Sequence, residues 1–345
     1  MKKILLFLFL LLLCALTLNS CGVSLGTLYP DGDTYSSGNV TLSTVPDTLI
    51  LHWSAGDVTL LPSDTDKVTI EETSKIALTE EQSVHWRLDG NELRIEYCAS
   101  GVPVPSDAEK RLTVTCPASA FSALLELSSA SGDIHAGETN AETVRVSTAS
   151  GNAEAVLHGT SSASFDTASG TVSAALDHVS DCSVDTASGA VSLTLDHVSG
   201  CSVDTASGDV SLALDSVSDC SVETASGKIT LSGSAERIRT NSAAGAAVCT
   251  VECRESLSVE TASGDVTVRA RVLPEKTVID TSSGSVSLFT AEDAGFTAEV
   301  STASGDFSSE LPVTVVSEER YRCGDGSAAI SISTASGDIS VYCLQ

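Results

Sequence analysis

The sequence is poor in aromatic residues, in basic residues and in long apolar runs. Aromatic side chains make up 4% of the 345 residues and methionine occurs once, so the chain lacks the bulk to fill a thick globular core. Lysine and arginine number 18 against 46 acidic residues, and the formal charge of −28 disfavours nucleic acids and acidic lipid surfaces as partners. A single strongly apolar stretch is present, near the N-terminus, which excludes a protein that spans the membrane many times.

That one apolar stretch has the features of a secretory signal. Lys2 and Lys3 precede an uninterrupted apolar run over residues 4–13, which is shorter than a membrane span. The run leads into Leu18-Asn19-Ser20-Cys21, which resembles a bacterial lipobox, although Asn19 is unusual at its position. The resemblance implies that Cys21 is acylated and tethers the chain to the outer face of a membrane. The alternative is ordinary cleavage nearby, which would leave Cys21 as a free thiol.

A short tag recurs along the chain. Ser129-Ala130-Ser131-Gly132 is the first clear copy, and it is followed by Thr-Ala-Ser-Gly tags and their variants. The tags that follow at intervals of 19 residues end at Gly151, Gly170, Gly189, Gly208 and Gly227. Less regular copies end at Gly245, Gly264, Gly284, Gly305 and Gly337. A fixed period of this kind indicates an architecture in which each repeat stacks on the next.

Residues on both sides of each tag alternate between apolar and polar, as the residues of β-strands do. The positions predicted to point inward hold mostly Val, Leu and Ile, with Cys182, Cys201 and Cys220 in one column. Each coil is therefore expected to contain a strand, a corner at the tag, a second strand and a loop. Two short strands cannot bury their apolar side alone, but stacked coils can. The sequence predicts an all-β fold, a single-stranded parallel β-helix or solenoid with coils of about 19 residues.

Four segments follow from these patterns. We expect a signal peptide at 1–20, a lipidated N-terminus and polar linker at 21–44, an N-terminal β cap with the first coils at 45–120, and the tag repeat at 121–345. The segment at 45–120 has a looser period, and its Trp53-Ser54-Ala55-Gly56-Asp57 looks like a degenerate tag. Its strand patterns lie at 48–53, 58–61, 67–71, 84–88, 92–97 and 111–116.

The repeat resembles a family of bacterial surface β-solenoid domains that goes by the name "putative adhesin". The resemblance rests on Leu112-Thr113-Val114-Thr115-Cys116-Pro117, on Ser129-Ala130-Ser131-Gly132-Asp133-Ile134 and on the repeated Thr-Ala-Ser-Gly-Asp-Val, and it covers roughly residues 45–345. It implies a parallel β-helix attached to the cell envelope. The family provides no catalytic residues to carry over.

Cysteine is unusually frequent for such a chain, with eleven residues. Cys14 leaves with the signal, and the column of Cys182, Cys201 and Cys220 fits small buried apolar side chains. Disulfides are common in exported proteins. The candidates for disulfides are Cys98 with Cys116, and Cys323 with Cys343.

One outward column is acidic. Its members are Asp166, Asp185, Asp204, Glu223, Glu260 and Asp280. Like charges stacked one coil apart repel each other, so a Ca²⁺ ion could be held there, with help from Asp209, Asp265 and Asp306 beside the tag glycines. The alternative is a solvated face that keeps the protein soluble and prevents lateral strand pairing. No other cofactor and no other metal site is expected.

These observations favour a non-enzymatic lipoprotein of the cell envelope, an adhesin-like structural or binding module with an acidic, Ser/Thr-rich surface. Its partners would be the membrane, through the lipid anchor, and an unidentified protein or surface glycan. Two alternatives remain open, a β-helix carbohydrate-active enzyme and an envelope-stress regulatory partner. The C-terminal coil shows no evident cap, which predicts end-to-end self-association through an exposed strand edge.

Overall fold

The computed structural model describes residues 23–25 and 27–344, and the chain divides into two compact units. The first unit holds the described residues up to 180 together with 184–189, and the second holds 181–183 and 190–344. Nearly all regular structure is β-strand. The short 3₁₀ helices of the first unit are η1 (Gly32–Thr34), η2 (Glu80–Gln82) and η3 (Ser106–Ala108). Within the described ranges, no helix has the length and apolarity that a membrane crossing requires.

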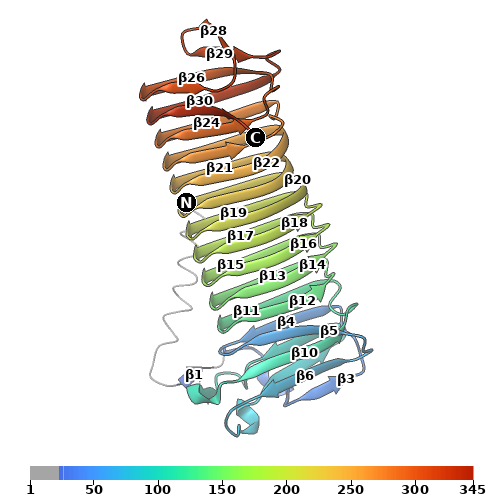
Figure 1. The fold of residues 1–345 in the computed structure, drawn as a ribbon. Coiled ribbons are helices and arrows are strands. Elements are labelled where there is room, and N and C mark those ends of the chain that lie inside the picture. The colour runs from blue at the N-terminus through green and yellow to red at the C-terminus, as the bar shows by residue number, and fades with distance from the viewer. Residues whose placement is uncertain (1–22, 26, 345) are drawn as a thin grey trace. The chain divides into compact units, whose positions relative to one another are not determined.

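The first unit contains the N-terminal strands and the first tagged coils (Figure 1). Its strands before the first tag are β1 (Val23–Leu25), β2 (Ser36–Ser37), β3 (Val40–Leu42), β4 (Thr48–Trp53), β5 (Val58–Ser63), β6 (Val68–Thr73), β7 (His85–Asp89), β8 (Glu92–Glu96), β9 (Pro103–Pro105) and β10 (Arg111–Pro117). Its tagged coils are built from β11 (Leu124–Ser131), β12 (Ile134–Thr139), β13 (Thr143–Ser150), β14 (Ala153–His158), β15 (Ser162–Ser169) and β16 (Val172–Asp177). Strand β17 (Asp181–Ser188) has residues in both units.

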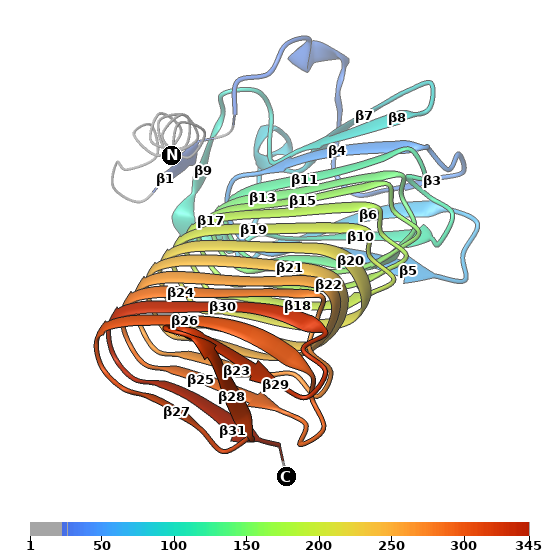
Figure 2. The same cartoon turned by 90° about the horizontal axis from the view of Figure 1, so that it is seen from above.

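The second unit continues the same pattern, with some coils formed by one long bent strand. Its strands are β18 (Val191–Asp196), β19 (Gly200–Ser207), β20 (Val210–Ser226), β21 (Ile229–Ala244), β22 (Ala247–Ser263), β23 (Val266–Arg269), β24 (Lys276–Ser283), β25 (Val286–Thr290), β26 (Phe296–Ser304), β27 (Phe307–Ser309), β28 (Val313–Ser317), β29 (Arg320–Cys323), β30 (Ala328–Ser336) and β31 (Ile339–Cys343). Figure 2 shows β24, β26 and β30 in one layer and β25, β27 and β31 in the other.

Equivalent strands of successive coils pair in parallel and in register, so the predicted solenoid is confirmed. In the first unit Val144 of β13 lies opposite Ala163 of β15, one period further on. In the second unit Val203 lies opposite Val222. These side chains are at most 2% exposed, and together they form the thin apolar column that the composition allows. Cys182, Cys201 and Cys220 are buried in the second unit, as their column predicts.

Each residue of the tag has a structural task at the corner. A Cβ on Gly151, which has φ of 152°, would lie 2.1 Å from the carbonyl oxygen of Gly132 in the preceding coil, so only glycine fits. The tag threonine points inward, and Thr334 Oγ1 donates a hydrogen bond to the Gly284 carbonyl at 3.1 Å. The residue after the glycine serves the neighbouring coil as well, because Asn152 N donates to Asp133 Oδ1 at 2.7 Å. The consensus Thr-Ala-Ser-Gly-Asp therefore recurs because its residues make the contacts between neighbouring coils.

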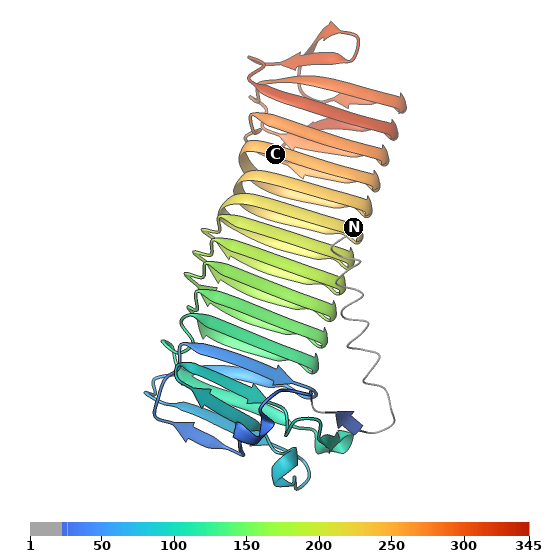
Figure 3. The same ribbon diagram turned by 180° about the vertical axis from the view of Figure 1, so that it is seen from behind.

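The N-terminal end of the first unit is built out of sequence order. Strand β4 pairs in parallel with β11 on one side and with the later strand β8 on the other. Its partner in the coil, β5, lies between β12 and β10 in the same way. Strands β7 and β6 then pair antiparallel to β8 and β10 and close this end (Figure 3). The predicted strand patterns between residues 48 and 116 all correspond to observed strands, and Gly56 lies in the glycine column beside Gly132.

The C-terminal end of the second unit also departs from sequence order, and this corrects one expectation. Strand β30 pairs with β24 on one side and with the earlier strand β26 on the other, and β31 lies between β25 and β27. Figure 1 shows β30 between β24 and β26. The hairpin β28–β29 covers the outer edge of β26 through an antiparallel pairing. The expectation of an uncapped C-terminal coil was therefore wrong, because β30 and β31 are paired on both sides. End-to-end self-association itself stays a prediction.

Candidate functional site

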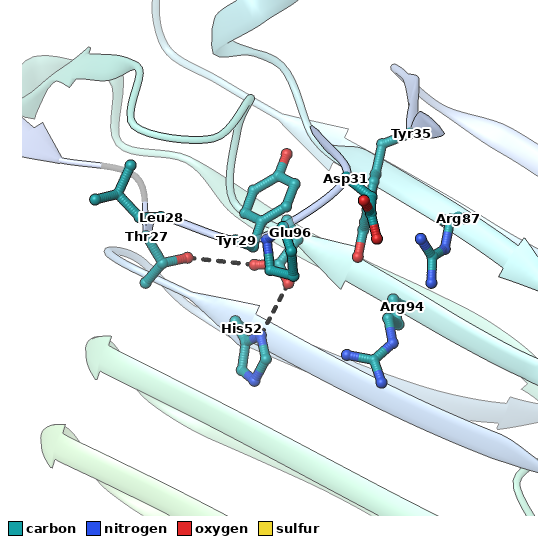
Figure 4. A pocket seen from close by; sticks show the side chains of 10 residues that line it. Thr27, Leu28, Tyr29, Asp31, Tyr35, His52, Arg87, Arg94 and Glu96 are labelled. Carbon is teal, nitrogen blue, oxygen red and sulfur yellow. Dashed lines mark hydrogen bonds and ion pairs between the residues drawn. The ribbon is translucent and has the colours of Figure 1, made fainter. Parts of the chain in front are cut away.

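A pocket of about 490 Å³ lies in the first unit between the strands of the N-terminal end and the segment that precedes them. We call residues 27–35 the strap and this cavity the strap pocket. The strap lines it with Thr27, Leu28, Tyr29, Pro30, Asp31 and Tyr35. Strands β4, β7 and β8 line it with His52, Arg87, Arg94 and Glu96 (Figure 4).

Alternation along β8 places the charged residues in this pocket. Leu93 and Ile95 are fully buried in the core, so Arg94 and Glu96 project from the opposite side of the strand. On the outward side of the neighbouring strand β4, His52 lies opposite Glu96. The strap then covers this side, which leaves Glu96 only 2% exposed.

The strap is docked on the strands by hydrogen bonds, which differs from the polar linker expected for this segment. Tyr29 Oη donates to the Cys98 carbonyl at 2.9 Å, and Tyr29 N donates to Ser100 Oγ at 3.0 Å. Thr27 Oγ1 donates to Glu96 Oε2 at 3.3 Å. Strand β1 pairs antiparallel to β9 just before the strap begins. Residues 23–25 and 27–35 are therefore part of the folded N-terminal end.

Glu96 is the electrostatic centre of the strap pocket. Its Oε1 lies 2.9 Å from His52 Nδ1, and its Oε2 accepts from Thr27 (Figure 4). The hydrogen bond to Glu96 raises the pKa of His52 above its usual value, although burial opposes the shift. Burial raises the pKa of Tyr29 and of Tyr35, so both phenols stay protonated at neutral pH. His52 and Glu96 therefore interact mainly with each other.

The two arginines of the strap pocket come from adjacent antiparallel strands, where Arg87 lies directly opposite Arg94. Arg94 forms an ion pair with Glu92. Arg87 Nη1 donates to Thr34 Oγ1 at 3.2 Å, and its guanidinium carbon lies 5.3 Å from the centre of the Tyr35 ring. Arg87 Nε is buried and has no hydrogen-bond partner among the described residues. Like charges directly across a strand pair destabilise it, which makes this pair unusual.

Sequence reasoning also missed a buried lysine. Lys110 is 1% exposed, and its Nζ lies 2.6 Å from Glu72 Oε1 and 4.1 Å from the centre of the Tyr97 ring. Desolvation lowers the pKa of Lys110 below its usual value. The Lys110 carbonyl occupies the corner above Gly56, where the other coils have a glycine. The ion pair belongs to the closure of this end, and the position of Lys110 before β10 offered no repeat signal that would have revealed it.

The predicted acidic column is brought together only in part. Asp204 lies opposite Glu223, and Glu260 lies opposite Asp280. Asn241 stands between Glu223 and Glu260 and interrupts the row. In the first unit Asp185 is half-buried, and burial raises the pKa of Asp166 above its usual value.

The acidic residues beside the tag glycines are engaged by the backbone. Asp209 Oδ1 accepts from Lys228 N at 2.8 Å, and Asp265 Oδ1 accepts from Ser285 N at 2.9 Å. Asp306 contributes its own N–H, which donates to Asp338 Oδ1 at 3.0 Å. Their first role is therefore to join neighbouring coils, and calcium in the acidic column stays a prediction.

The cysteines singled out from the sequence are free thiols. Cys98, Cys116 and Cys323 are buried, and Cys343 is half-buried. Burial raises the pKa of Cys98 and of Cys116 to about 11, so both thiols stay protonated at neutral pH. Neither predicted disulfide is formed in the structure. The lipidation candidate Cys21 lies outside the described residues.

Stacked parallel coils with a recurrent Thr-Ala-Ser-Gly-Asp corner define this chain as a β-solenoid. The model of the Toastrack DUF4097 family matches residues 46–245 and 236–342, so the chain belongs to that family. The resemblance inferred from the repeat is thereby confirmed. A comparison with curated proteins finds no match.

Solved structures similar to this chain include the following two. One is a Clostridium sporogenes protein described as a "putative cell adhesion protein", with a TM-score of 0.20 and 9% identity over 89% of this chain and 100% of that one. The other is a Bacteroides fragilis protein described as a "putative adhesin", with a TM-score of 0.28 and 13% identity over 89% of this chain and 96% of that one. The assignment to the family rests on the sequence match.

Proposed function

We propose that this chain is a non-enzymatic, lipid-anchored module of the cell envelope that binds a ligand at the bacterial surface, as an adhesin does. The observation that carries the proposal is the repetition of the coil. Each coil uses its inward side chains for the core and offers mostly small polar and acidic side chains at equivalent outward positions, so the surface is largely repeated from coil to coil. A repeated surface suits multivalent binding, whereas an active site needs one singular constellation.

The anchor fits the position of the first strand. Strand β1 begins at Val23, two residues after Cys21, and pairs with β9. A lipid on Cys21 would hold the N-terminal end of the first unit within about 7 Å of the attachment point, since a residue spans at most about 3.6 Å. Two or more acyl chains make such an anchor stable.

The anchor is tested by labelling cells with an alkyne-bearing fatty acid and comparing wild type with Cys21→Ser. We expect label and detergent-phase partition for the wild type and neither for the variant. A labelled Cys21→Ser chain would contradict the anchor. Binding is tested with cells that lack the protein, cells that carry it and cells that carry Cys21→Ser. Equal attachment of the three to host-cell or glycan-coated surfaces would contradict the adhesive role.

A further inference from the structure

The strap pocket contains a buried donor without an acceptor. Arg87 Nε has no hydrogen-bond partner among the described residues, although the guanidinium ends reach Thr34 and Asp89. The Arg87 side chain is 25% exposed, so most of its surface is removed from water. An unsatisfied buried donor destabilises the folded protein, and more so when the group is charged. Arg87 also lines the strap pocket, so an acceptor oxygen in the cavity would meet this incompletely bonded side chain.

A second observation indicates the charge of the missing group. Arg94 faces Arg87 across the strand pair, and Figure 4 shows both guanidinium groups directed to the same side. Glu92 pairs directly with Arg94, whereas the Asp89 carboxylate lies 3.8 Å from Arg87, so Arg87 is the less compensated of the two. Glu96, the buried carboxylate of this pocket, is already held by His52 and Thr27. A carboxylate between two guanidinium groups accepts several charge-assisted hydrogen bonds at once. The site therefore favours a planar anion.

The strap supplies the other wall, and that wall is suited to a sugar ring. The rings of Tyr29 and Tyr35 lie 4.8 Å apart at 50°, and both residues line the cavity. Asp31, held at φ of 56°, lines the same cavity with a carboxylate that can accept hydrogen bonds from hydroxyl groups. A volume of about 490 Å³ falls within the range of small-ligand pockets.

We propose that the strap pocket binds a sugar acid, with the carboxylate of the sugar between Arg87 and Arg94 and its hydroxyl groups toward Asp31 and the tyrosines. This assignment rests on the proposed binding function and names its ligand class. It adds a singular site, at the N-terminal end of the first unit, to the repeated surface of the coils.

The test is calorimetric titration of the full-length protein in detergent with D-glucuronate, D-glucose and inorganic phosphate. We expect saturable binding of glucuronate, and binding of glucose and of phosphate at least tenfold weaker. Arg87→Gln should weaken glucuronate binding at least tenfold. The matched control Arg145→Gln removes the same charge from an exposed outward position of the first unit and should leave binding unchanged.

Three results would overturn the proposal. If glucuronate does not bind, the site does not exist. If phosphate binds as tightly as glucuronate, the pocket recognises an anion and not a sugar acid. If Arg145→Gln weakens binding as much as Arg87→Gln does, the effect comes from net charge alone. If Arg87→Gln does not fold, saturation-transfer NMR on the wild type decides, because the glucuronate ring protons should receive magnetisation from Tyr29 and Tyr35. Binding without any attachment of cells would contradict the adhesive role alone, and attachment without glucuronate binding would contradict this site alone.

Discussion

One coil in each unit is inserted out of sequence order. These coils are β4–β5 in the first unit and β30–β31 in the second. In the first unit the outer neighbour is the later coil β8–β10, and behind it Lys110, Glu72 and Tyr97 form a closure of their own. In the second unit the outer neighbour is the earlier coil β26–β27, which is covered by the hairpin β28–β29.

The two closures differ in how much they bury. Lys110 and its surroundings are almost fully enclosed, whereas Val315 and Val316 of the hairpin are 67% and 56% exposed. The first end therefore has a small core outside the repeat. The stability of the second end depends on the inserted coil β30–β31. Substitutions at the two ends should therefore destabilise them to different extents, although the order of strands is similar.

The largest effect is expected when residues 328–345 are deleted. This removes the buried side chains Ile330, Ile332, Ile339 and Val341 and leaves β24 and β26 without their shared partner. At about 1.5–3 kcal/mol each, the loss is roughly 6–12 kcal/mol, comparable to the whole stability of a domain. Limited proteolysis and urea denaturation should show an unfolded C-terminal end. Val316→Ser should unfold like the wild type, and a deletion variant with the same midpoint would contradict the insertion.

The next effect is expected from Lys110→Met at the other end. It leaves Glu72 buried without its partner, and breaking a buried pair in this way costs about 3–5 kcal/mol. The double variant Lys110→Met with Glu72→Leu should recover most of the loss, because both charges are then replaced by apolar groups. Urea denaturation of the three proteins gives the comparison. Equal stability of the single and double variants would show that the charges are not coupled.

Alanine at the corner glycines compares the two ends directly. A Cβ on Gly56, at φ of 89°, would lie 1.8 Å from the Lys110 carbonyl oxygen, and a Cβ on Gly305 would lie 2.1 Å from that of Gly337. We expect losses of about 3 kcal/mol for Gly56→Ala and about 2 kcal/mol for Gly305→Ala, since strain adds to the contact at the first. Gly90→Ala, with φ of 58° and open space around it, should cost about 1 kcal/mol. Denaturation midpoints in the reverse order would contradict this ranking.

The smallest effect concerns pH and is confined to the first unit. The folded-state pKa of His52 is raised by Glu96, so its contribution to stability is present below the unfolded value of 6.5 and is lost as pH rises through the folded pKa. The midpoint of denaturation should fall between about pH 6 and about pH 9. His52→Gln should reduce that fall. An unchanged pH profile would show that the pair of His52 and Glu96 contributes nothing to stability.

Much of this fold followed from the period of the tag. The inward column of Val144 and Val203, the glycine corner and the strands of the N-terminal end were all predictable, because burial at period two and a turn at fixed spacing have few structural solutions. The order of coils at the C-terminal end was not. The tags ending at Gly305 and Gly337 carry nearly the same residues, so either coil fits either level, and only tertiary pairing selects one.

The strap pocket was missed for a different reason. Its residues come from segments without a repeat, and residues 27–35 are too polar to predict packing. Two signals were present nevertheless. Tyr29 and Tyr35 lie close together in a chain with 4% aromatic residues, and the alternation of Leu93 and Ile95 on β8 already directed Arg94 and Glu96 away from the core.

The insertion of β30–β31 has a consequence for the order in which the second unit folds. Synthesis proceeds from the N-terminus, so β24 and β26 are complete before β30, the strand that lies between them, has been made. Until then each of the two strands has an unpaired edge, which is open to proteases and to pairing with another chain. Once β30 and β31 are in place, their main chains are hydrogen-bonded on both sides, and these edges are closed.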